Sequence, residues 1–523
     1  MSFKSKSKST SPVPVLPLRK GLACTNCRRR KIKCDGVKPR CGPCTSSSSA
    51  WSDCQFSDEG STESEILEGE IARLEARLAQ LSSPTARKTS GSKNKESINV
   101  NLPQGCHGLP ASAVKVCLST FLRYSSELYF FLDVERLQRF LQTPQSCTSS
   151  PALLATMCLW GASLSTSPDI RAYETPLLSR ASESVAHSIG APTIIHTLQS
   201  QILLALYLLH SNRLVEGKYF TTAAVSLTLA SGIHQIRSPT PVSTGVQVLP
   251  PAADLAEEEE RIRAFWNVFV MANFWTSGDG SHTNKAYTPS GVSNEGVRID
   301  TPWPGSTKPS SFNVISRFLD RDSDEGISPF ALMSKASILF EQSATLAKAV
   351  TNLGADAIDE FWTRFQNLNA LADRILHALP PLQPAHIYRV GDTPRRLTLL
   401  MHTLVHVAII QLHMPFLVSI DDNHATRGRC IDAARSVVRA TQSVPNVHDF
   451  EYIDPIVATL WFKTCKALLD GVIAIQLNSG WAAGGPSVED LKTDLDVMES
   501  AMRALAPRCK LMASQLRVME NLR

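Results

Sequence analysis

Apolar residues recur at helical spacing through most of the chain from about residue 111 onward. Within 198–235, two apolar runs are separated near His210–Arg213, which predicts two helices with a break between them. The same spacing predicts further helices over Leu255–Trp275, Leu397–Phe416, 428–442, 454–477 and Val488–Leu505. No segment shows the alternation typical of a strand. Residues 111–523 are therefore predicted to form a large all-α domain.

Segments rich in Pro, Ser, Gly or charged residues separate the predicted elements. Within the helical region they lie at 238–253, 277–311 and 478–487, and Pro507 interrupts the last helical stretch. Nearer the N-terminus, residues 1–20 are predicted to be a disordered basic arm, and 57–66 and 82–110 to be linkers. The cysteine-rich unit at 21–56 stands between the arm and the first linker.

A short apolar series between these linkers has heptad spacing, which predicts a short coiled coil over 67–81. Its members are Leu67, Ile71, Leu74, Leu78 and Leu81. Only two heptads are present, Gly69 lowers helix propensity, and Glu70 would face Glu75 of a second copy. An amphipathic helix that packs on its own protein is the alternative.

Composition and charge place the chain among globular proteins with one basic segment. Of its 523 residues, 43% are hydrophobic and 19% charged, and we expect neither a secretory signal peptide nor a membrane span. Residues 1–54 contain 12 Lys and Arg against two Asp, a net charge of +10, whereas the remainder is −5. This partition indicates a polyanion-binding module on a mildly acidic body.

Six of the 13 cysteines lie between residues 24 and 54, and they form two similar halves. Each half is a C-x2-C pair followed, after six or nine intervening residues, by a third cysteine. Because no signal peptide is expected, metal is favoured over disulfides. Zinc prefers four ligands, so six thiolates can complete two Zn²⁺ sites only if two cysteines bridge both metals. The half-symmetry nominates Cys24 and Cys41 as the bridges, and Cys27, Cys34, Cys44 and Cys54 as the other ligands.

The segment ACTNCRRRKIKCDGVKPRCGPC, completed by Cys54, resembles the fungal Zn2Cys6 binuclear zinc cluster transcription factors. With two zinc ions the six thiolates carry −2, which leaves the segment at about +8. The resemblance implies that Pro39 turns the loop between the halves and that the first helix enters the DNA major groove. It further implies that Arg30 and Lys31 contact the bases of CGG half-sites. The remaining cations of the segment are expected to contact phosphates: Arg28, Arg29, Lys33, Lys38 and Arg40.

The helical region is similar to the fungal transcription factor regulatory domain, also called the middle homology region. The similarity rests on 198–234, RIRAFWNVFVMANFWTSG at 261–278, VRIDTPWP at 297–304 and HVAIIQLHMPF at 406–416. It implies control of the regulator through intramolecular contacts or a small-molecule effector. The family also implies that the 67–81 helix forms a homodimer, although a monomer or heterodimer stays open.

Three groups of residues in the helical region allow two interpretations each. The aromatic residues Phe265, Trp266, Phe269, Phe274 and Trp275 are interpreted as core rather than as a pocket. The run Glu257–Glu260 is interpreted as a solvated helix start that favours the helix dipole, rather than as an activation patch. A metal site at His402, His406 and His413 is disfavoured because no carboxylate or Cys completes it.

The leading hypothesis is a nuclear, sequence-specific regulator of RNA polymerase II transcription that binds double-stranded DNA and the transcription machinery. The run RRRKIK at 28–33 is also a candidate nuclear localisation signal. One alternative is a scaffold that keeps the cluster for protein contact without sequence-specific DNA binding. The other is an enzyme with an appended zinc module, but no phosphate-binding loop, Rossmann, metalloprotease or nucleophile-elbow motif is present.

Overall fold

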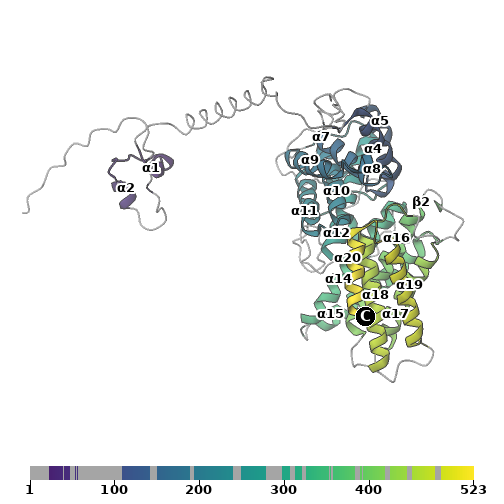
Figure 1. The fold of residues 1–523 in the computed structure, drawn as a ribbon. Coiled ribbons are helices and arrows are strands. Elements are labelled where there is room, and N and C mark those ends of the chain that lie inside the picture. The colour runs from purple at the N-terminus through teal and green to yellow at the C-terminus, as the bar shows by residue number, and fades with distance from the viewer. Residues whose placement is uncertain are drawn as a thin grey trace, which may run out of the picture. The chain divides into compact units, whose positions relative to one another are not determined.

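The structure is a computed structural model that divides into two units, Met1–Ile98 and Asn99–Arg523 (Figure 1). In the first unit it describes residues 23–38, 40–46, 54 and 56. In the second it describes 109–141, 150–188, 194–238, 249–277, 297–306, 313–320, 326–352, 354, 357–382, 389–390, 393–417, 424–444, 450–477 and 485–523. The predicted coiled coil at 67–81, the arm at 1–20 and the linker at 57–66 lie outside these residues, as does all of the 82–110 linker except its last two positions.

The first unit contains two helices of about one turn, α1 (Thr25–Arg29) and α2 (Gly42–Thr45). Each begins directly after the first cysteine of a C-x2-C pair. Helices of five and four residues are too short to be stable by themselves. Their conformation therefore depends on the cysteine cluster that flanks them.

The regular secondary structure in the described part of the second unit is helical, apart from one two-residue strand pair. Its first half contains α4 (Ala111–Tyr124), η1 (Ser125–Glu127), α5 (Val134–Leu141), α7 (Pro151–Ser163), α8 (Pro168–Arg171), α9 (Glu174–His187), α10 (Ile194–His210), α11 (Leu214–Ala230), η2 (Ile233–Gln235) and α12 (Leu255–Ser277). Its second half contains α13 (Val314–Leu319), α14 (Pro329–Ala349), η3 (Val350–Asn352), α15 (Ile358–Ala378), α16 (Arg395–His413), η5 (Met414–Phe416), α17 (His424–Gln442), α18 (Ile456–Leu477), α19 (Val488–Leu505) and α20 (Lys510–Leu522). The strands β1 (Arg389–Val390) and β2 (Thr393–Pro394) pair antiparallel just before α16.

Local sequence explains where several of these helices begin and end. Ser328 accepts the Ala331 N–H at the start of α14, and Pro329 follows it at the first helical position. A capping box formed by Ser487 and Asp490 begins α19. Between α10 and α11, Asn212 adopts a left-handed conformation with φ of 62°, which Asn tolerates better than most residues.

The helices of the second unit enclose one continuous hydrophobic core. In Figure 1, α4–α11 gather at one end of the unit and α16–α19 at the other. Helix α12 packs on α10 and α11 from the first group and on α14, while α20 packs on α18 and α19 and returns to α10. These two helices therefore join the two ends into one packed body.

The predicted helical domain and its break after His210 are confirmed. The predicted helix at Leu397–Phe416 ends as an α-helix at His413 and continues as the tighter η5, because Pro415 cannot donate the backbone hydrogen bond of an α-helix. The stretch Arg396–Phe416 is long and apolar enough to cross a membrane, but 78% of its apolar window is buried, as in the core helix of a folded domain. The predicted connection at 277–311 contains no helix or strand in its described residues 297–306, and within it Ile299–Trp303 is buried.

Candidate metal centre and nucleic-acid interface

The two C-x2-C pairs adopt the same local structure. Cys24 and Cys41 both have extended backbone conformations, and each stands immediately before a helix. The Cys27 N–H donates to Cys24 Sγ at 3.4 Å, so the first cysteine caps the helix that carries the second. In each half, one helical turn therefore brings two sulfurs to the same side of the backbone.

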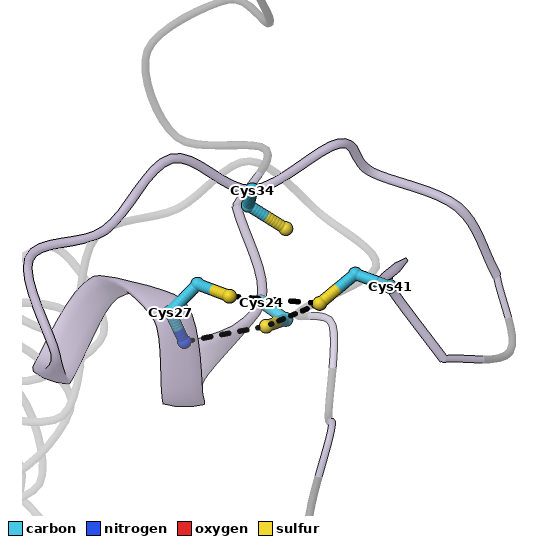
Figure 2. A group of neighbouring side chains, drawn as sticks. All are labelled: Cys24, Cys27, Cys34 and Cys41. Carbon is cyan, nitrogen blue, oxygen red and sulfur yellow. Dashed lines mark hydrogen bonds between the residues drawn. The ribbon is translucent and has the colours of Figure 1, made fainter. Parts of the chain in front are cut away.

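The loop between the two C-x2-C pairs folds so that the sulfurs of one pair lie next to those of the other. Cys41 Sγ lies 3.6 Å from Cys24 Sγ, 3.5 Å from Cys27 Sγ and 3.7 Å from Cys54 Sγ. Cys44 Sγ lies 3.8 Å from both Cys24 Sγ and Cys27 Sγ. A disulfide has a sulfur–sulfur distance of about 2.05 Å, so these are separate thiols. Figure 2 shows the sulfurs of Cys24, Cys27, Cys34 and Cys41 directed toward one another.

The sulfurs form two overlapping groups of four, each with all its sulfurs within 4.8 Å of one another. One group is Cys24, Cys27, Cys34 and Cys41, and the other is Cys24, Cys41, Cys44 and Cys54. A tetrahedron with Zn–S bonds of about 2.3 Å has sulfur–sulfur edges of about 3.8 Å, close to the observed spacing. The donor set therefore fits two zinc ions, with Cys24 and Cys41 common to both groups.

Burial disfavours a negative charge on Cys24 and Cys41 unless a cation accompanies it. Cys24, Cys27 and Cys41 are fully buried, and burial raises the pKa of the Cys24 thiol to about 12. The pKa of Cys41 is raised further for the same reason. Zinc binds thiolates, and its positive charge offsets the cost of burying deprotonated sulfurs.

Polar side chains around the sulfurs fix the two short helices, and the sequence reasoning did not identify them. The Asp35 carboxylate accepts the Gly42 N–H at 2.8 Å, at the start of α2, and also the Val37 N–H at 3.3 Å. Asn26 is buried on α1 and donates its Nδ2 to Cys44 Sγ at 3.5 Å. A Cβ at position 42 would stand 2.4 Å from Asp35 Oδ2, so this contact requires glycine. An acidic residue directly after Cys34 is the signal that could have indicated the first contact.

The cations expected to meet DNA are exposed wherever their side chains are described. These are Arg28, Arg30, Lys31, Lys33, Lys38 and Arg40; the side chain of Arg29 and the position of Pro39 lie outside the described residues. Lys31 has a left-handed backbone with φ of 52° and ends α1 one turn after it begins. The Lys38 ammonium lies 5.8 Å from the centre of the Phe56 ring. The module thus presents a positively charged surface around a sulfur core.

The aromatic residues predicted to be core in the helical domain are buried, which confirms that interpretation. Phe265, Trp266 and Phe274 have no exposed surface. The Trp266 ring stacks on Trp303 with centroids 4.5 Å apart, and its Nε1–H donates to the Pro302 carbonyl at 2.7 Å. Trp303 lies in a segment predicted to be a connection, so sequence periodicity could not identify this core partner.

The glutamate run at the start of α12 is half-buried rather than fully solvated. Glu257 pairs with Arg261, Glu258 with Arg237 and Glu259 with Arg263. Glu260 accepts the backbone N–H of Asp133 at 2.7 Å. The predicted helix start is confirmed, since Glu257 and Glu258 lie in the first turn of α12, and these carboxylates are partly solvated and paired.

Two of the three histidines weighed as a metal site contact other groups. His402 Nε2 lies 2.8 Å from the Pro380 carbonyl oxygen, and His413 Nε2 lies 2.8 Å from Asn369 Oδ1. Burial lowers the pKa of His406 and of His413 to about 4. Across the part of the chain that the structure describes, the groupings that could hold a metal consist of cysteines.

Comparison with known families gives two matches. Residues 22–63 match the fungal Zn(2)-Cys(6) binuclear cluster domain, and residues 118–280 match the fungal specific transcription factor domain. Both are domains of transcription factors and not of enzymes. The first of them binds two zinc ions.

Curated relatives match over short segments. The chain is 40% identical over 70 residues to the abscisic acid cluster transcription factor abl7 of Leptosphaeria maculans, covering 13% of this chain and 11% of that protein. It is 41% identical over 61 residues to the asperfuranone cluster transcription factor afoA of Emericella nidulans, covering 12% and 9%. It is 62% identical over 29 residues to the citrinin biosynthesis transcriptional activator mrl3 of Monascus ruber, covering 6% of each. The chain thus matches about a tenth or less of the length of these relatives, and no solved structure matches it significantly.

Proposed function

We propose that this chain, a Zn2Cys6 transcription factor with a fungal specific transcription factor domain, is a nuclear, sequence-specific DNA-binding regulator of RNA polymerase II transcription. The observation that carries the proposal is the combination of two sulfur groups sharing Cys24 and Cys41 with a row of exposed cations that begins on α1. A zinc-stabilised module too short to bury a core places these cations on a rigid surface, as phosphate and base recognition requires.

In this proposal, Cys24, Cys27, Cys34 and Cys41 hold one zinc ion. Cys24, Cys41, Cys44 and Cys54 hold the other, so Cys24 and Cys41 bridge the metals. The bridging assignment follows from the two groups of four sulfurs, since two ions need eight ligand positions and six sulfurs are available. The zinc ions supply charge and connectivity, and the protein side chains carry the recognition.

Arg30 and Lys31 are assigned to base edges of CGG-type half-sites, because Arg and Lys form the commonest specific contact with guanine O6 and N7. Arg28, Arg29, Lys33, Lys38 and Arg40 are assigned to phosphates, where they add affinity without sequence preference. Both Lys31 and Lys38 are exposed, so neither substitution removes a buried side chain, and the zinc content of each variant checks that the module is folded. They form a matched pair for separating the two roles.

The test is a DNA-binding titration of the full chain against a CGG site, a mutated site and random DNA at several salt concentrations. Lys31→Ala should lose discrimination between the CGG site and the others. Lys38→Ala should weaken binding to all three alike and reduce the salt slope by about one. Equal losses on all DNAs for Lys31→Ala would overturn the base-reading assignment.

The alternative is a zinc-cluster scaffold that contacts proteins and has no DNA sequence preference. It predicts full zinc loading together with equal affinity for the CGG site and random DNA. The proposed homodimer through 67–81 is tested separately by measuring the mass of the full chain in solution before and after Leu74→Glu. A mass that does not fall to that of one chain after the substitution would overturn it.

A further inference from the structure

A cavity of about 460 Å³ lies in the helical domain. Its wall is formed by η1 and the residues after it, α12, Pro304 and Gly305, the start of α14, the start of α16 and the segment 450–457. Lining residues therefore come from positions as far apart as Ser126 and Val457. This volume is in the range of pockets that enclose small organic molecules.

Most of the cavity wall is apolar or aromatic. Phe130, Phe330 and Phe450 present rings to it, and Leu397, Leu400 and Ile453 present aliphatic side chains. Such a wall gains free energy by covering an apolar ligand, and aromatic side chains favour ring-containing partners. The hydrophobic surface alone does not decide whether the ligand carries a charge.

Each arginine of the cavity wall is already neutralised by a carboxylate. Arg396 pairs with Glu127 at 2.7 Å, donates to the Tyr452 carbonyl at 3.0 Å and lies 5.2 Å from the Phe450 ring. Arg263 pairs with Glu259 at 3.1 Å. An anionic ligand would have to compete with one of these carboxylates, which costs an existing charge pair.

The buried acid of the wall is satisfied as well. Asp454 accepts hydrogen bonds from the Tyr129 hydroxyl and, at 2.9 Å, from the Ile456 N–H. A cationic ligand would therefore have to displace the Tyr129 hydroxyl to use this carboxylate. Neither sign of charge on a ligand meets an unpaired opposite charge among the described lining residues.

Asn267 on α12 adds an amide to this mainly apolar wall. Its side chain is 4% exposed, and its Nδ2 donates to the Arg263 carbonyl at 2.9 Å. The amide oxygen Oδ1 is a further hydrogen-bond acceptor. Tyr452 lines the cavity too, but its ring packs against Trp160 and His210, and its hydroxyl is fully buried. An amide on an apolar wall favours a ligand with one or two hydrogen-bonding groups.

We infer that this cavity binds an uncharged, ring-containing, mainly apolar small molecule with one or two hydrogen-bonding groups. The ligand contacts α12, α14 and α16 together, so its binding stabilises the helical domain. A role in controlling transcription rests on the proposed function, whereas the binding itself does not. The paired charges of the wall are what exclude carboxylates, phosphates and amines from the ligand class.

The test uses two fluorescent probes with the same ring system on the full chain. N-phenyl-1-naphthylamine is neutral, and 8-anilino-1-naphthalenesulfonate adds one negative charge. We expect saturable one-site binding of the neutral probe and at least tenfold weaker binding of the sulfonate. Equal or tighter binding of the sulfonate would overturn the assignment of an uncharged ligand.

Variants locate the binding to this cavity. Leu397→Trp fills part of the volume and should weaken the neutral probe at least tenfold, and Phe330→Ser should weaken it at least threefold. Leu376→Trp is the matched control, since Leu376 is likewise half-buried but does not line the cavity. Each variant's melting temperature is measured, so that only folded variants are compared. Unchanged affinity in folded Leu397→Trp and folded Phe330→Ser would overturn the site.

DNA binding by the same samples separates this inference from the proposed function. Loss of probe binding with retained CGG-site binding in Leu397→Trp is the expected result and supports the cavity assignment. A chain that binds the neutral probe but no specific DNA would overturn the proposed function and leave the cavity assignment standing.

Discussion

The cysteine module and the helical domain are stabilised by different means. In the described part of the module the buried side chains are cysteines and Asn26, whereas the helical domain buries tryptophans, phenylalanines and a continuous set of aliphatic residues. A segment of about 35 residues buries too little apolar surface to offset its conformational entropy, but a domain of about 400 residues does not face that limit. The module therefore uses metal coordination as its core, and the helical domain uses hydrophobic burial.

Zinc removal should have the largest effect that distinguishes the cysteine module from the helical domain. Chelation should unfold the module and leave the helices intact, because structural zinc contributes about 10–16 kcal/mol per site in small zinc domains. Hydrogen exchange with mass spectrometry on the full chain should show lost protection in 23–46. Peptides from α10 and α18 should be unchanged, and joint loss of protection in both units would contradict the comparison.

Trp266→Ala tests the other side of the comparison. It removes a fully buried ring, its stacking on Trp303 and its hydrogen bond to Pro302, and should cost about 3–5 kcal/mol of unfolding free energy. Urea unfolding followed by circular dichroism measures the loss. Zinc content should stay at two ions per chain, and Trp266→Phe should lose less stability than Trp266→Ala. A fall in bound zinc would show that the two units depend on one another.

Asp454→Asn probes the polar part of the helical core through pH. Burial raises the pKa of Asp454 from 3.8 to about 6, so the folded state favours the neutral acid. Its stabilising contribution is complete below about pH 4 and is lost as the pH rises through 6. The amide stays neutral and still accepts from Tyr129, so Asp454→Asn should be more stable than the parent chain above pH 6, by up to about 3 kcal/mol.

The measurement is the free energy of unfolding of both proteins between pH 4 and pH 7. The exposed Asp432→Asn is the control and should follow the pH dependence of the parent chain. Parallel curves for Asp454→Asn and the parent would contradict the assigned pKa shift.

Asp35→Ala, in the cysteine module, has the smallest expected effect. It removes the acceptor of the Gly42 N–H at the start of α2, a contact comparable to a helix cap and worth about 1 kcal/mol. Competition with a metal chelator should show several-fold weaker zinc retention, while Asp35→Asn keeps an acceptor and should fall between. Unchanged retention in Asp35→Ala would mean that the cysteines alone position α2.

The sequence by itself determined the features that depend on neighbours along the chain. Cysteine spacing predicted the metal module because one helical turn and two short loops are enough to bring its sulfurs together. Apolar periodicity predicted α10, α11, α12 and α18, since the period of a helix is a local property. The residue types that bind zinc are few, so their pattern is specific.

Only the tertiary structure decided which distant segments meet. Trp303 packs on Trp266 although it lies in a segment without periodicity, and Tyr129 donates to Asp454 across 325 positions of sequence. The cavity depends on six separate segments, and the pairing of Arg396 with Glu127 contributes to the class of ligand that it accepts. A one-dimensional pattern shows which face of each helix is buried, but the partner of that face is fixed only when all the helices pack together.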